Sequence, residues 1–255
     1  MLSKFADQRI NVLLIGEVSA GKSTLLNSVY ANTFSDMSMV RTTMTANIYS
    51  ETTDATKVMS AEYIYNKNTK NEEILKNQEL VEIKEELYYI KPSTNFGDVL
   101  RENNFGLNII DVPGLNDSKN DSATYKWLDN NLKHIDVIFH IIDVTKNLSN
   151  DSNFKIVKYL ADKLTSYKNI KFINVINKFD DVDDEDLIKA KEHAINMLKM
   201  LSINIPQNIV SISAKKGYLY RYVLQNNSLE GLSRRNRDLL ATTEFGLADK
   251  EIGYG

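Results

Sequence analysis

The sequence predicts an α/β fold in which helices cover both faces of a doubly wound, mostly parallel sheet. Three observations support this prediction. Short, almost continuously apolar runs alternate with longer helical segments, as expected for strands that are buried on both faces. Several of these runs end in motifs placed at the carboxyl end of a strand, where ligands bind in an open α/β sheet. Finally, 255 residues with 42% hydrophobic content suffice for one substantial core.

The order of these segments places each expected element. We expect strands at residues 9–15, 44–50, 107–112, 136–143, 170–177 and 208–213. The segments between them favour helices at residues 22–31, 122–134, 151–166 and 184–201. These elements define a domain over residues 1–220. One more helix, within residues 229–240, is expected in a C-terminal region of residues 221–255 that also includes an irregular tail.

The first apolar run leads directly into a phosphate-binding motif. It is followed by the pattern G-x-x-x-x-G-K-[S/T] and then by a helical segment, which is the context that this pattern requires. Backbone N–H groups of such a loop converge on an anion at the N-terminus of the helix. Lys22 would contact the β- and γ-phosphates, and the Ser23 hydroxyl would ligate Mg²⁺. The sequence therefore predicts that a nucleoside triphosphate binds to Gly16, Glu17, Val18, Ser19, Ala20, Gly21, Lys22, Ser23 and Thr24.

Two later strand ends carry residues that select the base. An N-K-x-D pattern ends the apolar run 170–176 and comprises Asn177, Lys178 and Asp180. A carboxylate at Asp180 can accept both N–H groups of the guanine edge, while Asn177 can bridge the purine and the loop. The Lys178 stem can lie over the base plane. The last expected strand ends in a second group beside the same pocket, Ser213, Ala214 and Lys215. Because both groups follow the phosphate-binding loop in this order, we expect GTP or GDP as the ligand.

A fourth motif, D-x-P-G, comes directly at the end of the expected strand 107–112. Asp111 suits the role of holding Mg²⁺ through water, and the N–H of Gly114 can donate to the γ-phosphate. With these motifs in register, the chain resembles a GTPase of the P-loop class across about residues 9–220.

Composition and charge weigh against several other classes of protein. The net charge of −3 provides no basic stripe for nucleic acid, so we expect no nucleic-acid partner. Without cysteine, the chain has neither disulfides nor thiolate metal sites. The first residues lack the apolar core of a signal peptide, and the longest apolar stretch, 137–142, is too short to span a bilayer. We therefore expect an intracellular, cytoplasmic protein.

Residues 51–105 form an insertion that is longer than the β-hairpin found at this place in the smallest GTPases. An alternating pattern over residues 55–66 predicts a strand. Residues 71–90 have the pattern of an amphipathic helix that ends at Lys91 and Pro92. Its apolar stripe consists of Leu80, Ile83, Leu87 and Ile90. We expect this helix to lie on the edge of the sheet, with partner binding as the alternative.

The motifs G-x-x-S-x-G-K-S and D-x-P-G-L, a threonine-bearing first switch segment and the long insertion together resemble the dynamin superfamily of large GTPases, especially its bacterial-type members. The resemblance implies that Ser19 helps to hold a monovalent cation, K⁺ or Na⁺, and to orient the attacking water. It also implies a switch threonine that ligates Mg²⁺ and positions this water. Thr43 is the first candidate, Thr42 the second and Thr45 the third.

Leu115 follows D-x-P-G, at the place where Ras-like small GTPases carry a glutamine that orients water. An apolar side chain cannot do this. The resemblance therefore implies a homodimer in which two G domains meet through their nucleotide faces, with slow turnover in the monomer and faster turnover in the assembly. Arg41 precedes the candidate threonines and is a candidate arginine finger, either in cis or across such a dimer.

Two features depart from this resemblance. Dynamin itself has glutamine where this chain has Val18, and its base-reading motif begins with threonine where this chain has Asn177. Only residues 216–255 follow the last motif, so we expect an isolated G domain or a fragment of a longer protein. Membrane association would then depend on missing segments or on partners. Two alternatives stay open: a GTP-loaded scaffold with negligible hydrolysis, and a GTPase of the septin, immunity or Era type.

Overall fold

The structure is a computed structural model that describes residues 9–37, 43–75, 78–93, 98–116, 121–146, 151–179, 184–200, 208–230, 232 and 234–244. Its strands are β1 (Arg9–Gly16), β2 (Ala46–Glu51), β3 (Glu85–Ile90), β4 (Gly106–Asp111), β5 (Val137–Asp143), β6 (Lys171–Asn177) and β7 (Asn208–Ile212). Its helices are α1 (Lys22–Tyr30), α2 (Ala61–Leu75), α3 (Asp98–Glu102), α4 (Asp121–Asn131), α5 (Asp151–Leu164), α6 (Asp184–Met200), α7 (Ala214–Asn226) and α8 (Arg234–Glu244), and a short 3₁₀ helix spans Leu132–His134.

The seven strands form one sheet in the order β3-β2-β4-β1-β5-β6-β7. The pairs β1–β4, β1–β5, β5–β6 and β6–β7 are parallel, whereas β2 is antiparallel to β4 and parallel to β3. The prediction of a mostly parallel sheet is therefore confirmed, and the two reversed strands form one edge. The antiparallel pairing puts Asn47 opposite Asp111, so the start of β2 lies beside the end of β4.

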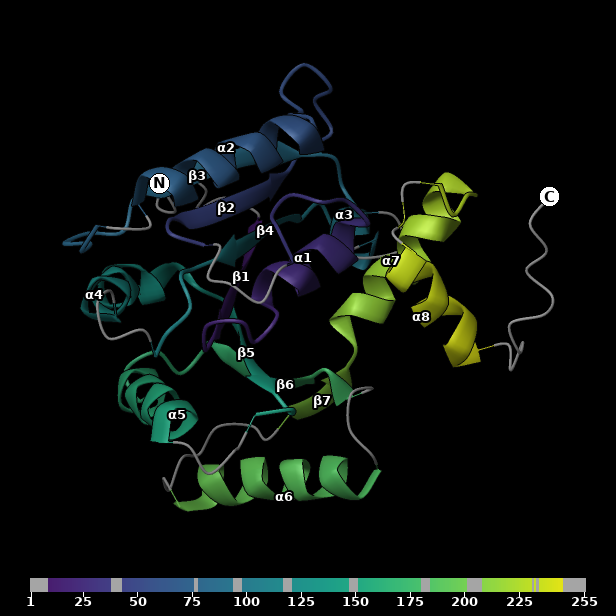
Figure 1. Ribbon diagram of the computed structural model, residues 1–255. Coiled ribbons are helices and arrows are strands. Elements are labelled where there is room, and N and C mark those ends of the chain that lie inside the picture. The colour runs from purple at the N-terminus through teal and green to yellow at the C-terminus, as the bar shows by residue number, and fades with distance from the viewer. Residues whose placement is uncertain are drawn as a thin grey trace.

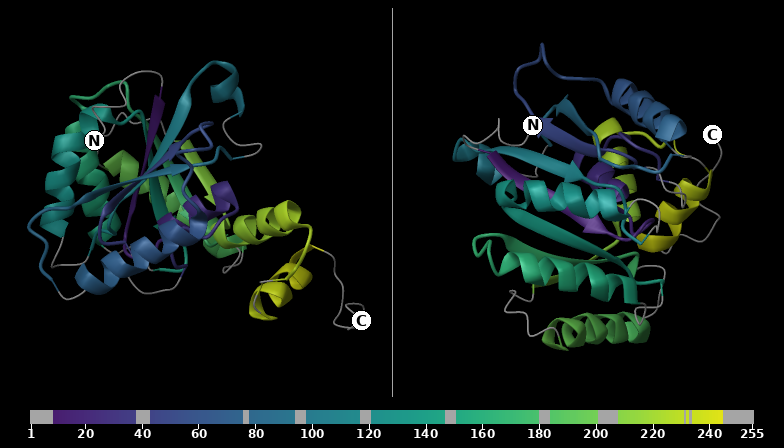
Figure 2. Two further views of the ribbon diagram at one scale, coloured as in Figure 1. Left: turned by 90° about the horizontal axis from the view of Figure 1, so that it is seen from above. Right: turned by 90° about the vertical axis from the view of Figure 1, so that its left-hand side faces the viewer.

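Helices cover both faces of the sheet, which confirms the doubly wound arrangement (Figures 1 and 2). Alternate side chains of a strand point to opposite faces. In β1, Leu13 and Ile15 join a core with α4 and α5, whereas Val12 and Leu14 join a second core with α1 and α2. Trp127 of α4 is buried in the first of these cores.

The inserted segment folds differently from its predicted elements. The strand predicted over residues 55–66 and the helix predicted over residues 71–90 are both wrong. Instead, α2 occupies residues 61–75, and residues 85–90 form strand β3. Ile64, Asn68 and Leu75 are the buried residues of α2, at a spacing that places them on one side of a helix.

The residues of the apolar stripe that predicted a helix over residues 71–90 are divided between the cores on the two faces of the sheet. Leu80 and Ile83 precede β3 and are buried in the core that contains α4 and α5, and Leu87 packs against the same core. Ile90 is buried in the core that contains α1 and α2. In a strand, residues 87 and 90 point to opposite faces because their separation is odd. The helical spacing of this stripe was therefore a coincidence, and pairing with β2 decides the structure.

The C-terminal region also departs from its expected boundaries. The domain boundary expected at residue 220 falls inside α7, a helix that the sequence analysis did not predict. The helix expected within residues 229–240 is α8, which spans Arg234–Glu244 and therefore begins and ends later than expected. Ser213 caps the start of α7, since its hydroxyl accepts a hydrogen bond of 3.2 Å from the N–H of Lys216. Apolar side chains join α7 and α8 through Tyr218, Leu219, Leu232, Leu239 and Leu240.

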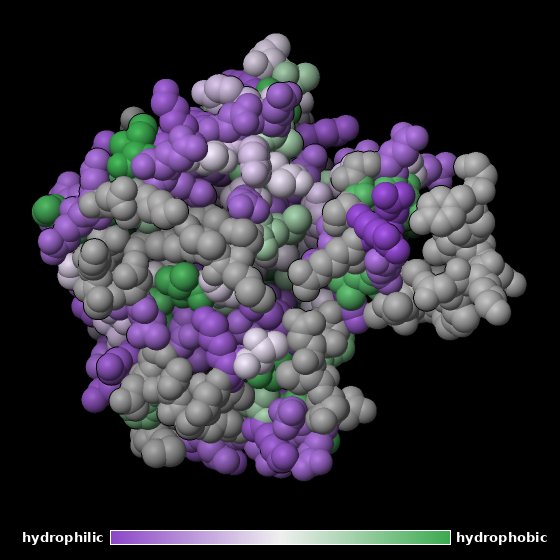
Figure 3. All heavy atoms as spheres, in the orientation of Figure 1, coloured by the Kyte–Doolittle hydropathy of each residue, from purple (hydrophilic) through white to green (hydrophobic). Residues whose placement is uncertain are grey.

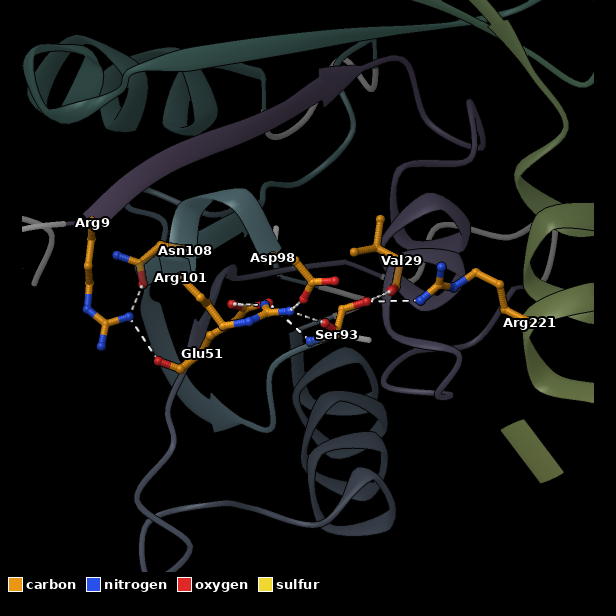
Figure 4. A network of polar contacts seen from close by, with 8 residues as sticks. All are labelled: Arg9, Val29, Glu51, Ser93, Asp98, Arg101, Asn108 and Arg221. Carbon is orange, nitrogen blue, oxygen red and sulfur yellow. Dashed lines mark hydrogen bonds and ion pairs between the residues drawn. The ribbon is translucent and has the colours of Figure 1, made fainter. Parts of the chain in front are cut away.

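A network of polar contacts lies at the end of the sheet opposite the carboxyl ends of the parallel strands (Figure 4). The buried carboxylate of Glu51 accepts hydrogen bonds from the N–H of Ser93 (3.2 Å) and from Arg101 (3.4 Å). The Ser93 hydroxyl donates to the carbonyl oxygen of Val29 in α1 (2.6 Å) and accepts from Arg221 in α7 (2.9 Å). These contacts join the inserted segment to the two helices.

Several large hydrophobic side chains are exposed among the described residues. On the face seen in Figure 3, most described residues are hydrophilic, and the hydrophobic ones lie apart from one another. Two of the most exposed hydrophobic side chains, Val81 and Leu224, belong to different parts of the fold, the α2–β3 connection and α7. Within the described ranges, no helix is both long and apolar enough to cross a membrane.

Candidate functional site

The phosphate-binding motif lies between β1 and α1, as predicted. Lys22 is the first residue of α1, and its buried ammonium donates to the carbonyl oxygens of Gly16 (3.2 Å) and Glu17 (2.9 Å). Gly21 precedes the helix with a φ of +99°, a conformation that other residues rarely adopt. A Cβ atom there would also lie only 2.1 Å from Nδ2 of Asn177. Glycine at this position therefore allows the loop to turn into the helix, whose N-terminus is suited to bind an anion.

Three oxygen-bearing side chains meet beside this loop. The Ser23 hydroxyl donates to Oδ2 of Asp111 at 2.6 Å and lies 3.2 Å from the hydroxyl of Thr43, which reaches the same carboxylate oxygen at 3.4 Å. Hydroxyl and carboxylate oxygens are ligands that Mg²⁺ prefers. The other oxygen of Asp111, Oδ1, has no hydrogen-bond partner among the described residues, although this residue is fully buried. The donor set and the unpartnered buried oxygen fit a magnesium site.

The environment of Asp111 supports the same interpretation. Burial raises the pKa of this carboxyl, while the positive charge of Lys22 and the hydrogen bonds from Ser23 and Thr43 act in the opposite direction. Because burial is the largest of these effects, the charged carboxylate is costly in this position without an additional cation.

The antiparallel pairing of β2 with β4 explains why Thr43 reaches Asp111. Thr43 lies just before β2, whose start is beside the end of β4. Thr45 makes a different contact, because its hydroxyl donates to Oδ1 of Asn47 at 2.6 Å. Of the two described candidates, Thr43 and not Thr45 is therefore hydrogen-bonded to Ser23 and Asp111. Thr42 and Arg41 lie outside the described residues.

The D-x-P-G-L segment lies against the phosphate-binding loop. The N–H of Leu115 donates to the carbonyl oxygen of Gly16 (3.1 Å), and the N–H of Val18 donates to the carbonyl oxygen of Leu115 (3.1 Å). At Gly114 a Cβ atom would lie 2.6 Å from Cα of Val18, so a larger residue would push the two loops apart. The Leu115 side chain is fully buried in the core that contains α4 and α5.

Asn177, which the sequence predicts to read the base, is also brought to the loop. Nδ2 of Asn177 donates to the carbonyl oxygen of Ala20 (2.9 Å), and its Oδ1 accepts from the N–H of Ala214 (3.0 Å). Asn177 therefore connects the phosphate-binding loop with the segment Ser213–Lys215 at the end of β7. Lys178 adopts a φ of +64°, and its ammonium donates to Asp143 at 2.6 Å. Asp180 lies outside the described residues.

The remaining residues of the predicted site lie where the motifs place them. Ala20 is fully buried, whereas Val18, Ser19 and Thr24 are partly exposed, and Ser19 has a φ of +64°. Lys215 is exposed at the start of α7.

Two residues of the site were missed by sequence reasoning, and both come from the end of β5. Asp143 is buried and accepts the hydrogen bond from Lys178. Lys146 follows it, and its ammonium donates to the carbonyl oxygen of Val18 at 2.7 Å and lies 3.5 Å from the carboxylate of Glu17. A signal existed for Asp143, because it ends an apolar strand at the same edge of the sheet as Asp111 and Asn177. Lys146 had no comparable signal, since a lysine in a loop is common.

Comparisons with known proteins agree with this geometry. The chain matches the model of the dynamin family over residues 12–179, which is more than half of its length. It is 26% identical over 186 residues to "Uncharacterized protein R618" of Acanthamoeba polyphaga mimivirus, an alignment that covers 70% of this chain and 30% of that protein.

Solved structures show the same fold. A protein from an oligomerised bacterial dynamin pair, described as providing a mechanism for the long range sensing and tethering of membranes, superimposes with a TM-score of 0.51 at 17% identity, over 94% of this chain and 38% of that chain. Era in complex with MgGDPNP and part of 16S ribosomal RNA superimposes with a TM-score of 0.50 at 18% identity, over 89% of this chain and 60% of that one. This chain thus spans less than two thirds of each of these relatives.

The family model begins in β1 and ends just beyond β6, so it includes the phosphate-binding loop, Thr43, Asp111 and Asn177. We conclude that this chain belongs to the dynamin family and contains a GTP-binding G domain of the P-loop GTPase class.

Proposed function

We propose that this chain binds GTP together with Mg²⁺ and hydrolyses it to GDP and phosphate. The meeting of Ser23, Thr43 and Asp111 beside the phosphate-binding loop is the observation that carries the proposal. These residues come from three separate segments, and their oxygens converge where the motif predicts a magnesium ion. A loop that only bound phosphate would need the glycines and Lys22, but not this set of oxygens.

In the proposed reaction, a water oxygen attacks the γ-phosphorus and the bond to the β–γ bridging oxygen breaks. Bound Mg²⁺ would draw negative charge from the β- and γ-phosphate oxygens. Lys22 neutralises further charge on the same oxygens, and the N–H of Gly114 donates to the γ-phosphate. Thr43 helps to position the attacking water. The roles of these residues in catalysis are thus to orient and to stabilise charge, with no covalent intermediate.

Base recognition follows from the position of Asn177. Its two hydrogen bonds, to Ala20 and Ala214, hold the base-reading segment against the phosphate-binding loop. The ion pair between Lys178 and Asp143 holds the lysine stem in place. We propose that Asp180 accepts the two N–H groups of guanine, which adenine does not offer in the same pattern.

The burial of Leu115 bears on the rate of hydrolysis. Its side chain cannot reach the attacking water, so the isolated G domain lacks the glutamine used by Ras-like enzymes. We propose that turnover is slow in the monomer and that a homodimer formed through the nucleotide face accelerates it. A monovalent cation at Ser19 and an arginine finger from Arg41 are further parts of this proposal. The same observation favours a second candidate function, a GTP-loaded scaffold with negligible hydrolysis.

The test is to measure GTP turnover per molecule as a function of protein concentration, in potassium, in sodium and in neither. Lys22→Ala serves as the blank, and size-exclusion chromatography with GDP and with GDP–aluminium fluoride reports the oligomeric state. Turnover that rises with concentration, together with dimers that form only with aluminium fluoride, would support the enzyme. GTP binding without turnover at any concentration would refute hydrolysis and favour the scaffold.

A further inference from the structure

We infer that Lys146 is a specificity-determining residue that distinguishes GTP from GDP by contacting the γ-phosphate. This inference deepens the proposed function and rests on it. The ammonium of Lys146 donates to the carbonyl oxygen of Val18 at 2.7 Å and lies 3.5 Å from the carboxylate of Glu17. Glu17 and Val18 belong to the phosphate-binding motif, whereas Lys146 comes from the segment after β5.

The position of Val18 locates this ammonium within the site. The N–H of Val18 donates to Leu115, and its Cα would be 2.6 Å from a Cβ placed on Gly114. Gly114 is the residue whose N–H is expected at the γ-phosphate, so Val18 lies at that end of the loop. Lys22, by contrast, contacts the carbonyl oxygens of Gly16 and Glu17.

The sheet order explains how Lys146 reaches this place. Strand β1 lies between β4 and β5, so the loop that follows β1 has the D-x-P-G-L segment on one side and the end of β5 on the other. The peptide groups of Val18 are accordingly bonded on both sides, by Leu115 through the N–H and by Lys146 through the carbonyl oxygen. Lys22 and Lys146 therefore both contact the segment 16–18, Lys22 through the carbonyl oxygens of Gly16 and Glu17 and Lys146 through the carbonyl oxygen of Val18.

The contacts of Lys146 also suit a residue that changes partner. Its side chain is 37% exposed and flexible, and one of its partners, Glu17, is an acid that is almost fully buried. A γ-phosphate adds negative charge at this end of the loop, and it competes with the Val18 carbonyl for the ammonium. GDP carries no group at this position, so the contacts with Val18 and Glu17 would persist when GDP is bound.

The experiment measures equilibrium dissociation constants of GDP and of a non-hydrolysable GTP analogue, with Mg²⁺ present, for the wild type and Lys146→Ala. We expect the constant for the GTP analogue to rise about tenfold or more, since a charge-assisted hydrogen bond is lost, while the constant for GDP changes by less than about twofold. Lys126→Ala is the matched control, because Lys126 belongs to α4 and forms an ion pair with Glu82 of the α2–β3 connection.

Two further variants separate charge from structure. Lys146→Gln retains a donor for the Val18 carbonyl but has no charge, so it should lose affinity for the GTP analogue as Lys146→Ala does. Lys146→Arg should restore most of the affinity. Equal losses of affinity for both nucleotides, or an unchanged dissociation constant of the GTP analogue for Lys146→Gln, would overturn the inference, because Lys146 would then only support the loop. Failure of the wild type to bind the GTP analogue would instead refute the proposed function itself.

Discussion

The nucleotide-binding end of the sheet and the inserted edge formed by β2, α2 and β3 both bury polar side chains, but their contacts differ. At the nucleotide-binding end, Oδ1 of the buried Asp111 has no hydrogen-bond partner among the described residues. At the inserted edge, the buried Asn68 of α2 uses its whole amide group. Its Nδ2 donates to the carbonyl oxygen of Phe34 (2.8 Å) and to the hydroxyl of Tyr49 (3.1 Å), and its Oδ1 accepts from Tyr88 (2.8 Å).

This difference separates Asp111 from Asn68. A buried polar group without a partner destabilises the fold. Oδ1 of Asp111 lies beside the phosphate-binding loop within a set of oxygens that suits Mg²⁺, so a ligand that completes it is the simplest explanation at this position. A buried polar group whose partners are all protein groups stabilises one arrangement of the chain. We therefore expect substitutions at the nucleotide-binding end to change binding more than stability, and substitutions at the inserted edge to do the reverse.

The largest effect on binding is expected for Lys22→Ala. Two charge-assisted hydrogen bonds to phosphate oxygens would be lost, so the dissociation constant for GTP should rise by about 10²–10⁴. The free energy of unfolding without nucleotide should change by only about 1 kcal/mol, since two carbonyl oxygens lose a donor. Isothermal titration calorimetry and urea denaturation measure the two quantities. A variant that binds GTP within tenfold of the wild type would contradict the assignment of this site.

The largest effect on stability is expected for Tyr88→Ala. Tyr88 is fully buried, its ring lies 5.4 Å from that of Tyr49, and Lys67 lies over it. Removing an aromatic side chain from a core costs about 3–5 kcal/mol. The dissociation constant for GTP should stay within about threefold, because the packing that is lost lies at the inserted edge and effects at distant sites are independent.

Tyr88→Phe is the control for this variant, and it also applies if Tyr88→Ala does not fold. It keeps the ring and removes only the hydrogen bond to Asn68, so the free energy of unfolding should fall by about 1 kcal/mol. A large loss of GTP affinity in the well-folded Tyr88→Phe would show that the two regions are not separate.

Asn68→Ala should reduce stability by an intermediate amount and should also change nucleotide release. Tyr49, Tyr88 and the carbonyl oxygen of Phe34 would lose their partner, and the free energy of unfolding should fall by about 2–3 kcal/mol. Phe34 belongs to the connection that leads from α1 towards Thr43, so nucleotide release should become a few-fold faster. Stopped-flow fluorescence with a labelled nucleotide measures this rate.

A matched control lies on the same helix. Nδ2 of Asn71 has no hydrogen-bond partner among the described residues, so Asn71→Ala should leave both stability and release nearly unchanged. If Asn68→Ala and Asn71→Ala behave alike, the contact of Asn68 with Phe34 does not influence the nucleotide site.

The smallest effect is expected for Asp111→Asn, on the stability of the nucleotide-free protein. Its pKa is raised by burial, so the folded state holds a proton more tightly than the unfolded state. The stability from this difference is fully present below the unfolded pKa of about 4 and is lost as the pH rises through the folded pKa. Asparagine does not ionise, so Asp111→Asn does not lose stability as the pH rises. At pH 7 the variant should therefore be more stable than the wild type by on the order of 1 kcal/mol.

The measurement is thermal unfolding without nucleotide from pH 4 to pH 8, for wild type and variant together. Asp111→Asn should also abolish the additional stabilisation by GTP with Mg²⁺. If the variant is less stable than the wild type at pH 7, the charged form of Asp111 is not destabilising and the interpretation of its unpartnered oxygen is wrong.

The nucleotide-binding end was largely predictable because its chemistry depends on short contiguous motifs. A loop that binds phosphate needs glycine at Gly21 and an ammonium at Lys22, and these requirements hold for residues that are neighbours in the chain. The sequence ranked Thr43 first among the threonines, but its contact with Asp111 could not be predicted, because that contact depends on the antiparallel pairing of β2 with β4. Lys146 was missed for a similar reason, since only the position of β5 beside β1 brings it to Val18.

By itself, the sequence determined the fold class and the position of the phosphate-binding loop between β1 and α1, because local motifs at strand ends carry that information. The guanine-reading role of Asn177, Lys178 and Asp180 stays a prediction. The tertiary structure alone decided the inserted edge. There, residues 71–90 contain a helical spacing of apolar side chains, yet Leu87 and Ile90 point into different cores. Pairing with β2 and the contacts of Asn68 with Phe34, Tyr49 and Tyr88 join residues that are far apart in the chain. Such contacts produce no periodic pattern of apolar residues in the sequence, because many different apolar patterns fill a core equally well.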